Sequence, residues 1–483
     1  MVFTSTRYLL FLPCVVLLYY ILPHRFRWVM LLAASFYFYS CWSIWMLPWL
    51  IGIILISYTA GLLMDSEDGQ TSLSATRRRW GILLGIVSLI AVLFSLKYLN
   101  FLVEQIEAVG SALGSDKTLP RFNWVVPVGI SFFIFQAMGY VFDVYRGKTK
   151  AATHLGKYAL FIAFFPHLAQ GPIDRSDNLL PQIDEVHRFD SVAARRALVL
   201  IFFGVFKKVV VADRLAVFVD TVFGNVAQYS GLSCWVAALF YSFQIYCDFS
   251  GYTDIALGSA GLMGFRLVEN FNTPYLATSI ADFWRRWHIS LSRWFRDYIY
   301  IPLGGSRVTE VRWAFNVMAV FLVSGIWHGA AWTFILWGVL HGLFQIIGKY
   351  KSKLVKKLIP TENLAVRTVR ILITFTLVTL LWSLFRAASI ADYWTLLKGM
   401  VSFSSGSDLL ALGMEKNELI LSFALIGLTI IFDLLHAKVG LPDAVERLAL
   451  PLRWVIYLVF LFTIILFGRY GSLTADSFIY FQF

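Results

Sequence analysis

The chain has 483 residues, of which 59% are hydrophobic and only 14% are charged. A soluble protein needs far more charge on its surface, so this composition excludes a soluble globular protein and indicates an integral membrane protein. The formal net charge of +12 is typical of cytoplasmic loops rich in Lys and Arg, and we expect no nucleic-acid partner.

Apolar runs of spanning or near-spanning length follow one another along the chain. They cover residues 8–22, 28–41, 43–64, 80–99, 124–145, 155–171, 197–212, 233–262, 313–327, 330–348, 368–387, 418–435 and 453–468. A perpendicular transmembrane helix needs about 20 residues, so the runs at 28–41 and 155–171 are expected to be short, tilted or re-entrant. We predict an all-α, polytopic transmembrane helix bundle of about ten to twelve spans, forming one domain over residues 1–483.

Basic clusters between these runs predict the orientation of the bundle. They are Arg25 and Arg27, Arg77 to Arg79, and the lysines from Lys349 to Lys357. Cytoplasmic loops are enriched in Lys and Arg, so these clusters should face the cytoplasm. Segments 100–123 and 388–417 should then lie outside, together with both termini. Region 150–232 mixes charges of both signs, and its sidedness stays open.

One charged segment, Ala281 to Gly305, departs from the membrane pattern. Apolar residues recur in it at helical spacing, namely Phe283, Trp287, Leu291, Trp294, Phe295 and Tyr298. Arginines stand between them, namely Arg285, Arg286, Arg293 and Arg296. The segment is too charged to span the bilayer in contact with lipid. It is expected either to lie on the cytoplasmic interface as an amphipathic helix or to enter the protein as a re-entrant element.

His328 is the first candidate for chemistry, because it stands at the junction of two apolar runs. The small residues around it, such as Gly325 and Gly329, predict space for a substrate, with Trp327 and Trp332 as walls. An imidazole, whose ordinary pKa is about 6.5, is a suitable base for removing a proton from a hydroxyl group. The alternative is a histidine that hydrogen-bonds between helices.

Two further histidines and the arginines have open roles. His288 either takes part in catalysis or anchors the arginine-rich segment, whereas His341 is expected to pack or hydrogen-bond. The four arginines suit the phosphates of a ligand at the cytoplasmic face, since guanidinium binds phosphate through two hydrogen bonds, but lipid headgroups are an equal alternative. The spacing of the histidines and of the four cysteines does not predict a metal site.

Several strings together resemble the membrane-bound O-acyltransferase family, in its alginate O-acetylation branch. They are Pro127–Gln136, Phe164–Pro172, Tyr246–Asp254, Glu269–Tyr275, Asp282–Gly305, Ser324–Gly338 and Phe478–Phe483. The resemblance implies re-entrant or interfacial helices around a central funnel, which an acyl donor enters from the cytoplasm. It also implies that His328 is the catalytic histidine and that His288 is the second polar residue of the active site.

The hypothesis that follows is an acetyl-transferring enzyme of the bacterial inner membrane. In it Arg285, Arg286, Arg293 and Arg296 bind the phosphates of acetyl-CoA, and Trp327 and His288 position the donor. His328 deprotonates an acceptor hydroxyl. The resemblance implies a periplasmic SGNH-type acetyltransferase or another extracytoplasmic acyl acceptor as partner, and an exported, alginate-like polysaccharide as the final target. The alternatives are a D-alanyl transfer protein for teichoic acid and a transporter with a polar core.

Overall fold

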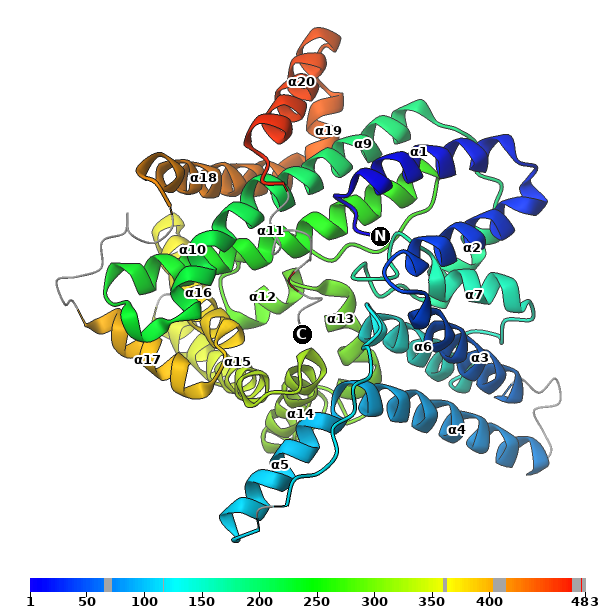
Figure 1. Ribbon diagram of the computed structural model, residues 1–483, viewed down its shortest axis with the longest axis horizontal. Helices are drawn as coiled ribbons and strands as arrows, with labels where there is room; N and C mark the ends of the chain where they lie inside the picture. The colour runs from blue at the N-terminus through cyan, green and yellow to red at the C-terminus, as the bar shows by residue number, and fades with distance from the viewer. Residues whose placement is uncertain (65–71, 116, 359–362, 403–413, 471–478, 480–483) are drawn as a thin grey trace. The chain divides into compact units, whose positions relative to one another are not determined.

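The computed structural model describes residues 1–64, 72–115, 117–358, 363–402, 414–470 and 479, and the regular elements within these ranges are all helical (Figure 1). The predicted all-α class is therefore confirmed. Six of the described helices are long and apolar enough to cross a membrane, which confirms a polytopic membrane protein. The prediction of about ten to twelve spans stays a prediction. Residues 403–413 of the segment expected outside, and most of the terminal string Phe478–Phe483, lie outside the described residues.

The long helices coincide with the apolar runs of the sequence. They are α1 (Thr6–Ile21), α2 (His24–Ser40), α3 (Leu47–Met64), α4 (Ser72–Lys97), α6 (Ile130–Tyr145), α9 (Ser191–Val205), α11 (Leu232–Leu262), α14 (Glu310–His328), α15 (Trp332–Leu358), α16 (Leu364–Arg386), α18 (Lys416–Val439) and α20 (Leu450–Phe467). The run at 155–171 forms only the nine-residue helix α7 (Leu155–Ala163). Pro166 follows that helix, and proline cannot donate the hydrogen bond that would continue it.

Helices in the more polar segments are the ones that periodicity did not predict. They are α5 (Leu99–Ala112), α8 (Ser176–Asp184), α10 (Asp213–Gly224), α17 (Ile390–Val401) and α19 (Leu441–Glu446). The segment expected as an outer loop at 100–123 thus begins with a helix. The apolar stripes of these five helices are short and lie between charged residues, so the hydropathy pattern alone did not distinguish the helices from loops.

The chain divides into two compact units. The first unit comprises Met1–Ala194 with Ser259–Val268, and the second comprises Arg195–Gly258 with Glu269–Phe483. In the first unit, α3 packs against α4, α6 and α7. In the second unit, α14 packs along α15, which also contacts α16 (Figure 1). The candidate site residues His288, Trp327 and His328 all belong to the second unit.

Buried ion pairs join the helices of the second unit. The π-helix η2 (Phe206–Ala212) places two successive lysines inside the protein. Lys207 pairs with Asp254 at 2.7 Å, and Lys208 pairs with Asp248 at 2.7 Å and with Asp213 at 2.8 Å. Charges taken out of water need such partners. Asp248 and Asp254 of α11, which lie in one of the strings that carried the resemblance, are therefore bound by lysines that the sequence did not indicate.

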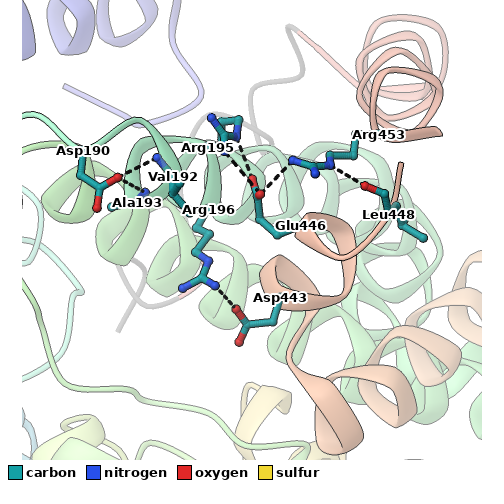
Figure 2. Close-up of polar contacts among 9 residues, drawn as sticks. All are labelled: Asp190, Val192, Ala193, Arg195, Arg196, Asp443, Glu446, Leu448 and Arg453. Carbon is teal, nitrogen blue, oxygen red and sulfur yellow. Dashed lines mark hydrogen bonds and ion pairs between the residues drawn. The ribbon is translucent and has the colours of Figure 1, made fainter. Parts of the chain in front are cut away.

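A second group of ion pairs lies where α9, α19 and α20 meet (Figure 2). Glu446 accepts hydrogen bonds from Arg195 at 2.8 Å and from Arg453 at 2.9 Å, while Arg196 pairs with Asp443 at 2.8 Å. The hydrogen bond from Arg195 keeps the pKa of Glu446 below its ordinary value. On the orientation predicted from the sequence, the connection from α18 to α20 is cytoplasmic. On that orientation, Arg195 and Arg196 also lie on the cytoplasmic side. This extends the predicted orientation to part of region 150–232.

Glycines set the close approach of α14 and α15. A Cβ atom on Gly325 would lie 2.4 Å from the carbonyl oxygen of Phe334, and one on Gly338 would lie 2.3 Å from the carbonyl oxygen of Phe321. A Cβ atom on Gly329 would lie 2.2 Å from the Phe334 ring. The expectation that Gly325 and Gly329 leave space for a substrate was therefore wrong, because neighbouring backbone and side-chain atoms fill the space beside them.

Gly325→Ala should destabilise the protein by about 1–3 kcal/mol, because the added methyl group has to displace the backbone of α15. Gly348→Ala on α15 is the matched control, since no atom lies within 4 Å of its Cβ position. Helix propensity predicts that this control is as stable as the wild type, or up to about 1 kcal/mol more stable. Thermal unfolding of the purified variants in one detergent measures the difference. Equal midpoints for the two variants would contradict the packing argument.

Candidate functional site

The charged segment forms two short helices instead of one. Helix α12 (Ile280–Arg286) begins where the side chain of Ser279 accepts a hydrogen bond from the backbone of Asp282. Helix α13 (Ile289–Phe295) continues into the π-helix η5 (Arg296–Tyr300). Between them, His288 has φ 43° and ψ 56°, in the left-handed region. For a residue with a Cβ atom this backbone costs about 1–2 kcal/mol, so surrounding contacts must stabilise it.

Asn270 supplies those contacts. Its carbonyl oxygen accepts from the Ile289 backbone N–H at 2.9 Å. Its side-chain Oδ1 accepts from the hydroxyl of Ser290 at 2.6 Å and from the Ser290 backbone N–H at 3.3 Å. The same Oδ1 lies 3.4 Å from Nδ1 of His288. Asn270, His288 and Ser290 are all buried, so this turn is a fixed internal structure.

The apolar side of the segment is buried against protein. Phe283, Trp287 and Leu291 are each 1% exposed. The ring of Trp287 lies 4.8 Å from that of Trp382 on α16. This burial contradicts an amphipathic helix with its apolar face in lipid, and it agrees with the alternative that protein surrounds the segment.

Aromatic rings enclose His328 at the carboxyl end of α14. The His328 ring centroid lies 4.8 Å from Trp327, 5.0 Å from Trp337 and 5.2 Å from Phe385. His328 itself is 4% exposed. Trp332, expected as a wall of this pocket, is 53% exposed, and Trp337 one turn further along α15 contacts the histidine instead. Neither Trp337 nor Phe385 was a candidate from the sequence.

Trp327 brings the two candidate histidines together. Its ring lies 4.8 Å from that of His328 and 6.0 Å from that of His288. On another side, Phe249 of α11 lies 4.8 Å from the His288 ring. Two imidazoles that are 40 positions apart in the sequence thus share one indole as neighbour.

The buried surroundings of His288 affect its protonation. Burial lowers its pKa to about 3, because a charged imidazolium loses its hydration inside the protein. The ring is therefore neutral near pH 7. A neutral imidazole carries one N–H group and one lone pair, so His288 can both donate and accept a hydrogen bond.

Three of the four arginines, Arg285, Arg293 and Arg296, are exposed, whereas Arg286 is half-buried. The side chain of Arg285 is 75% exposed and that of Arg296 is 57% exposed. Acidic neighbours partly neutralise them, since Asp282 pairs with Arg285 at 3.5 Å and with Arg286 at 3.1 Å, and Asp297 pairs with Arg296 at 2.7 Å. Arg293 lies in the last turn of α13 and is also exposed. The structure leaves the head groups of Arg285, Arg293 and Arg296 accessible to phosphate, and the ligand of the four arginines stays a prediction.

The remaining candidates have structural surroundings. His341 accepts a hydrogen bond from the indole N–H of Trp284 at 3.2 Å, as expected for a packing and hydrogen-bonding histidine. The four cysteines are free. Among the residues that the structure describes, no group of three or more His, Cys, Asp or Glu side chains could hold a metal ion. Asn270 is a further residue that the sequence did not indicate, although its string Glu269–Tyr275 was among those that carried the resemblance.

Comparison with known proteins gives the family. Residues 31–391 match the membrane-bound O-acyltransferase family. The chain is 39% identical to the probable alginate O-acetylase AlgI of Azotobacter vinelandii, over 83% of this chain and 78% of that protein. It is 36% identical to the peptidoglycan O-acetyltransferase of Helicobacter pylori, over 84% of this chain and 81% of that protein.

A teichoic acid D-alanyltransferase of Bacillus subtilis is a more distant relative. It is 30% identical over only 49% of this chain and 62% of its own length. Membership of the family implies that the chain uses an acyl donor. Together with the six apolar helices of spanning length, these matches show that the chain belongs to the membrane-bound O-acyltransferase family and is a multi-pass membrane O-acyltransferase.

Proposed function

We propose that the enzyme transfers acetyl groups from cytoplasmic acetyl-CoA to a hydroxyl group on the outer side of a bacterial inner membrane. The relatives named as O-acetylating enzymes align with more than four-fifths of this chain, which supports acetyl as the acyl group. The observation that carries the proposed site is the pair of buried histidines that both neighbour the Trp327 ring.

In the proposed reaction, His328 is the general base. It takes the proton of the acceptor hydroxyl, and the oxygen attacks the carbonyl carbon of the acetyl thioester. The C–S bond then breaks, and the coenzyme A thiolate receives the proton from His328, so that the imidazole returns to its neutral form. His288 and Trp327 position the donor. A positioned base of this kind typically contributes about 10²–10⁴-fold to the rate.

The arginine-rich segment would bind the other end of the donor. Arg285 and Arg286 lie in α12, Arg293 lies in α13, and Arg296 begins the π-helix η5 that continues α13. The turn between α12 and α13 carries His288. One segment would therefore bind the phosphates of coenzyme A and place a side chain next to its acyl group. This connection between the charged surface and the buried histidine supports a phosphate-bearing donor over isolated contacts with lipid headgroups.

The acceptor belongs to a partner outside the cytoplasm. The relatives are named for alginate and for peptidoglycan, which are both carbohydrate polymers with free hydroxyl groups. We propose that an SGNH-type periplasmic acetyltransferase, or another extracytoplasmic acyl acceptor, receives the acetyl group and passes it to an exported polysaccharide. D-alanyl transfer is less well supported, because the D-alanyltransferase of Bacillus subtilis aligns with only half of this chain.

His328→Gln should reduce acetyl transfer by about 10²–10⁴-fold, because the general base is lost while an uncharged side chain of similar size remains. The measurement follows labelled acetyl groups from acetyl-CoA to a candidate acceptor, using membranes with equal amounts of enzyme. His341→Gln is the control. It loses the hydrogen bond to Trp284 and should lower thermal stability while the folded enzyme keeps its turnover. Wild-type turnover in His328→Gln would refute the catalytic assignment.

The double variant Arg285→Gln, Arg293→Gln should raise the KM for acetyl-CoA by about tenfold or more, since each lost charged hydrogen bond typically costs about 1.5–3 kcal/mol. The kcat should change less, because these residues are proposed to bind the donor and not to take part in the chemistry. The double variant Lys438→Gln, Arg447→Gln is the control, because it removes the same charge from exposed positions elsewhere. An unchanged KM with lowered stability would assign the two arginines to lipid contact instead.

A further inference from the structure

The contacts of the left-handed turn at His288 determine where the imidazole carries its proton. A neutral histidine carries its proton either on Nδ1 or on Nε2, and the partner of one nitrogen decides which form is present. Only the form with the proton on Nδ1 leaves the lone pair on Nε2. The state of His288 therefore depends on which atom faces its Nδ1.

The hydrogen bonds of Asn270 identify that atom. The side chain of Asn270 accepts from the backbone N–H of Ser290 at 3.3 Å. A backbone N–H can only donate, so the atom that receives it is the amide oxygen Oδ1 and not the amide nitrogen. The opposite orientation of the amide would place two donors against each other inside the protein, and this costs free energy. The orientation of Asn270 is thus fixed by the backbone.

The same oxygen faces the histidine ring. Oδ1 of Asn270 lies 3.4 Å from Nδ1 of His288. An amide oxygen has no proton to donate, so a hydrogen bond between these atoms requires the proton to be on Nδ1. Asn270 also receives the backbone N–H of Ile289 at 2.9 Å, so one residue determines both the backbone of the turn and the partner of the ring.

We propose that Asn270 is a positioning residue, which fixes His288 with its proton on Nδ1 and so presents Nε2 as a hydrogen-bond acceptor to an N–H or O–H group of the substrates. This inference rests on the proposed function, in which His288 contacts the substrates. Asn270 acts through His288 and has no chemical step of its own. The residue lies 18 positions before His288 in the sequence, on the segment that enters α12.

Three variants separate this role from simple packing. Asn270→Leu keeps a similar volume and removes the acceptor. Asn270→Asp keeps an oxygen opposite Nδ1, so it is expected to preserve the tautomer and to retain more activity than Asn270→Leu. Ser290→Ala is the matched control, because it removes the hydroxyl that lies 2.6 Å from Oδ1 but leaves the backbone N–H and the histidine contact in place.

The direct test is the tautomer of His288 in the full-length protein. The chain has eight histidines, and nitrogen NMR of protein labelled with ¹⁵N-histidine in lipid vesicles distinguishes a protonated Nδ1 from a protonated Nε2. The His288 signals are those missing from His288→Gln. We expect the wild type and Ser290→Ala to show the proton on Nδ1. Protonation on Nε2 in the wild type would overturn the inference, even if Asn270→Leu did not fold.

Kinetics provide the second measurement. Loss of a residue that orients another functional group typically costs about 10–100-fold, so the kcat of Asn270→Leu should fall within this range. The KM for acetyl-CoA and the activity of Ser290→Ala should change little. If His288→Gln is inactive while folded Asn270→Leu has wild-type kcat, the inference fails and the proposed function stands. If His288→Gln is fully active, the proposed role of His288 fails first, and the inference fails with it.

Discussion

The close contact between α14 and α15 is the constraint on which the site depends. Gly325 and Gly338 let the two backbones approach so closely that even one methyl group has no room. Since His328 ends α14 and Trp337 lies on α15, this approach sets the 5.0 Å distance between their rings. Small residues are the usual way for helices to pack in membranes, where apolar side chains gain little from leaving lipid. Here the same small residues also fix the surroundings of the catalytic candidate.

The second histidine depends on a different kind of contact. His288 occupies a backbone region that is unfavourable for its residue type, and hydrogen bonds from a distant part of the chain stabilise it there. Strained residues held by their surroundings are common at functional sites, because the strain fixes a side chain in one direction. Trp327 connects the two histidines, so helix packing and a hydrogen-bonded turn meet at one indole.

Charged side chains elsewhere in the second unit are also paired with side chains of opposite charge. Lysines of the π-helix η2 pair with aspartates of α11, and arginines at the start of α9 pair with acidic residues of α19 (Figure 2). Ions removed from water are stable only with good partners. The buried pairs of η2 and α11 therefore join these two elements, while Arg285 of α12 and Arg293 of α13 stay exposed and suit a ligand from solution.

The sequence by itself determined the membrane class, the long apolar helices and the candidate histidines. Long apolar runs predict helices in lipid, because a single segment can satisfy all its backbone hydrogen bonds there only as an α-helix. Polar residues such as His328 are easily recognised within these runs. Only the tertiary structure decided the rest. It showed that the glycines near His328 serve helix contact, that Trp337 replaces Trp332 beside the histidine, and that Asn270 supports His288. These are contacts between residues of different helices and segments. Hydrophobic periodicity indicates only which side of a helix is apolar, not which residue that side contacts.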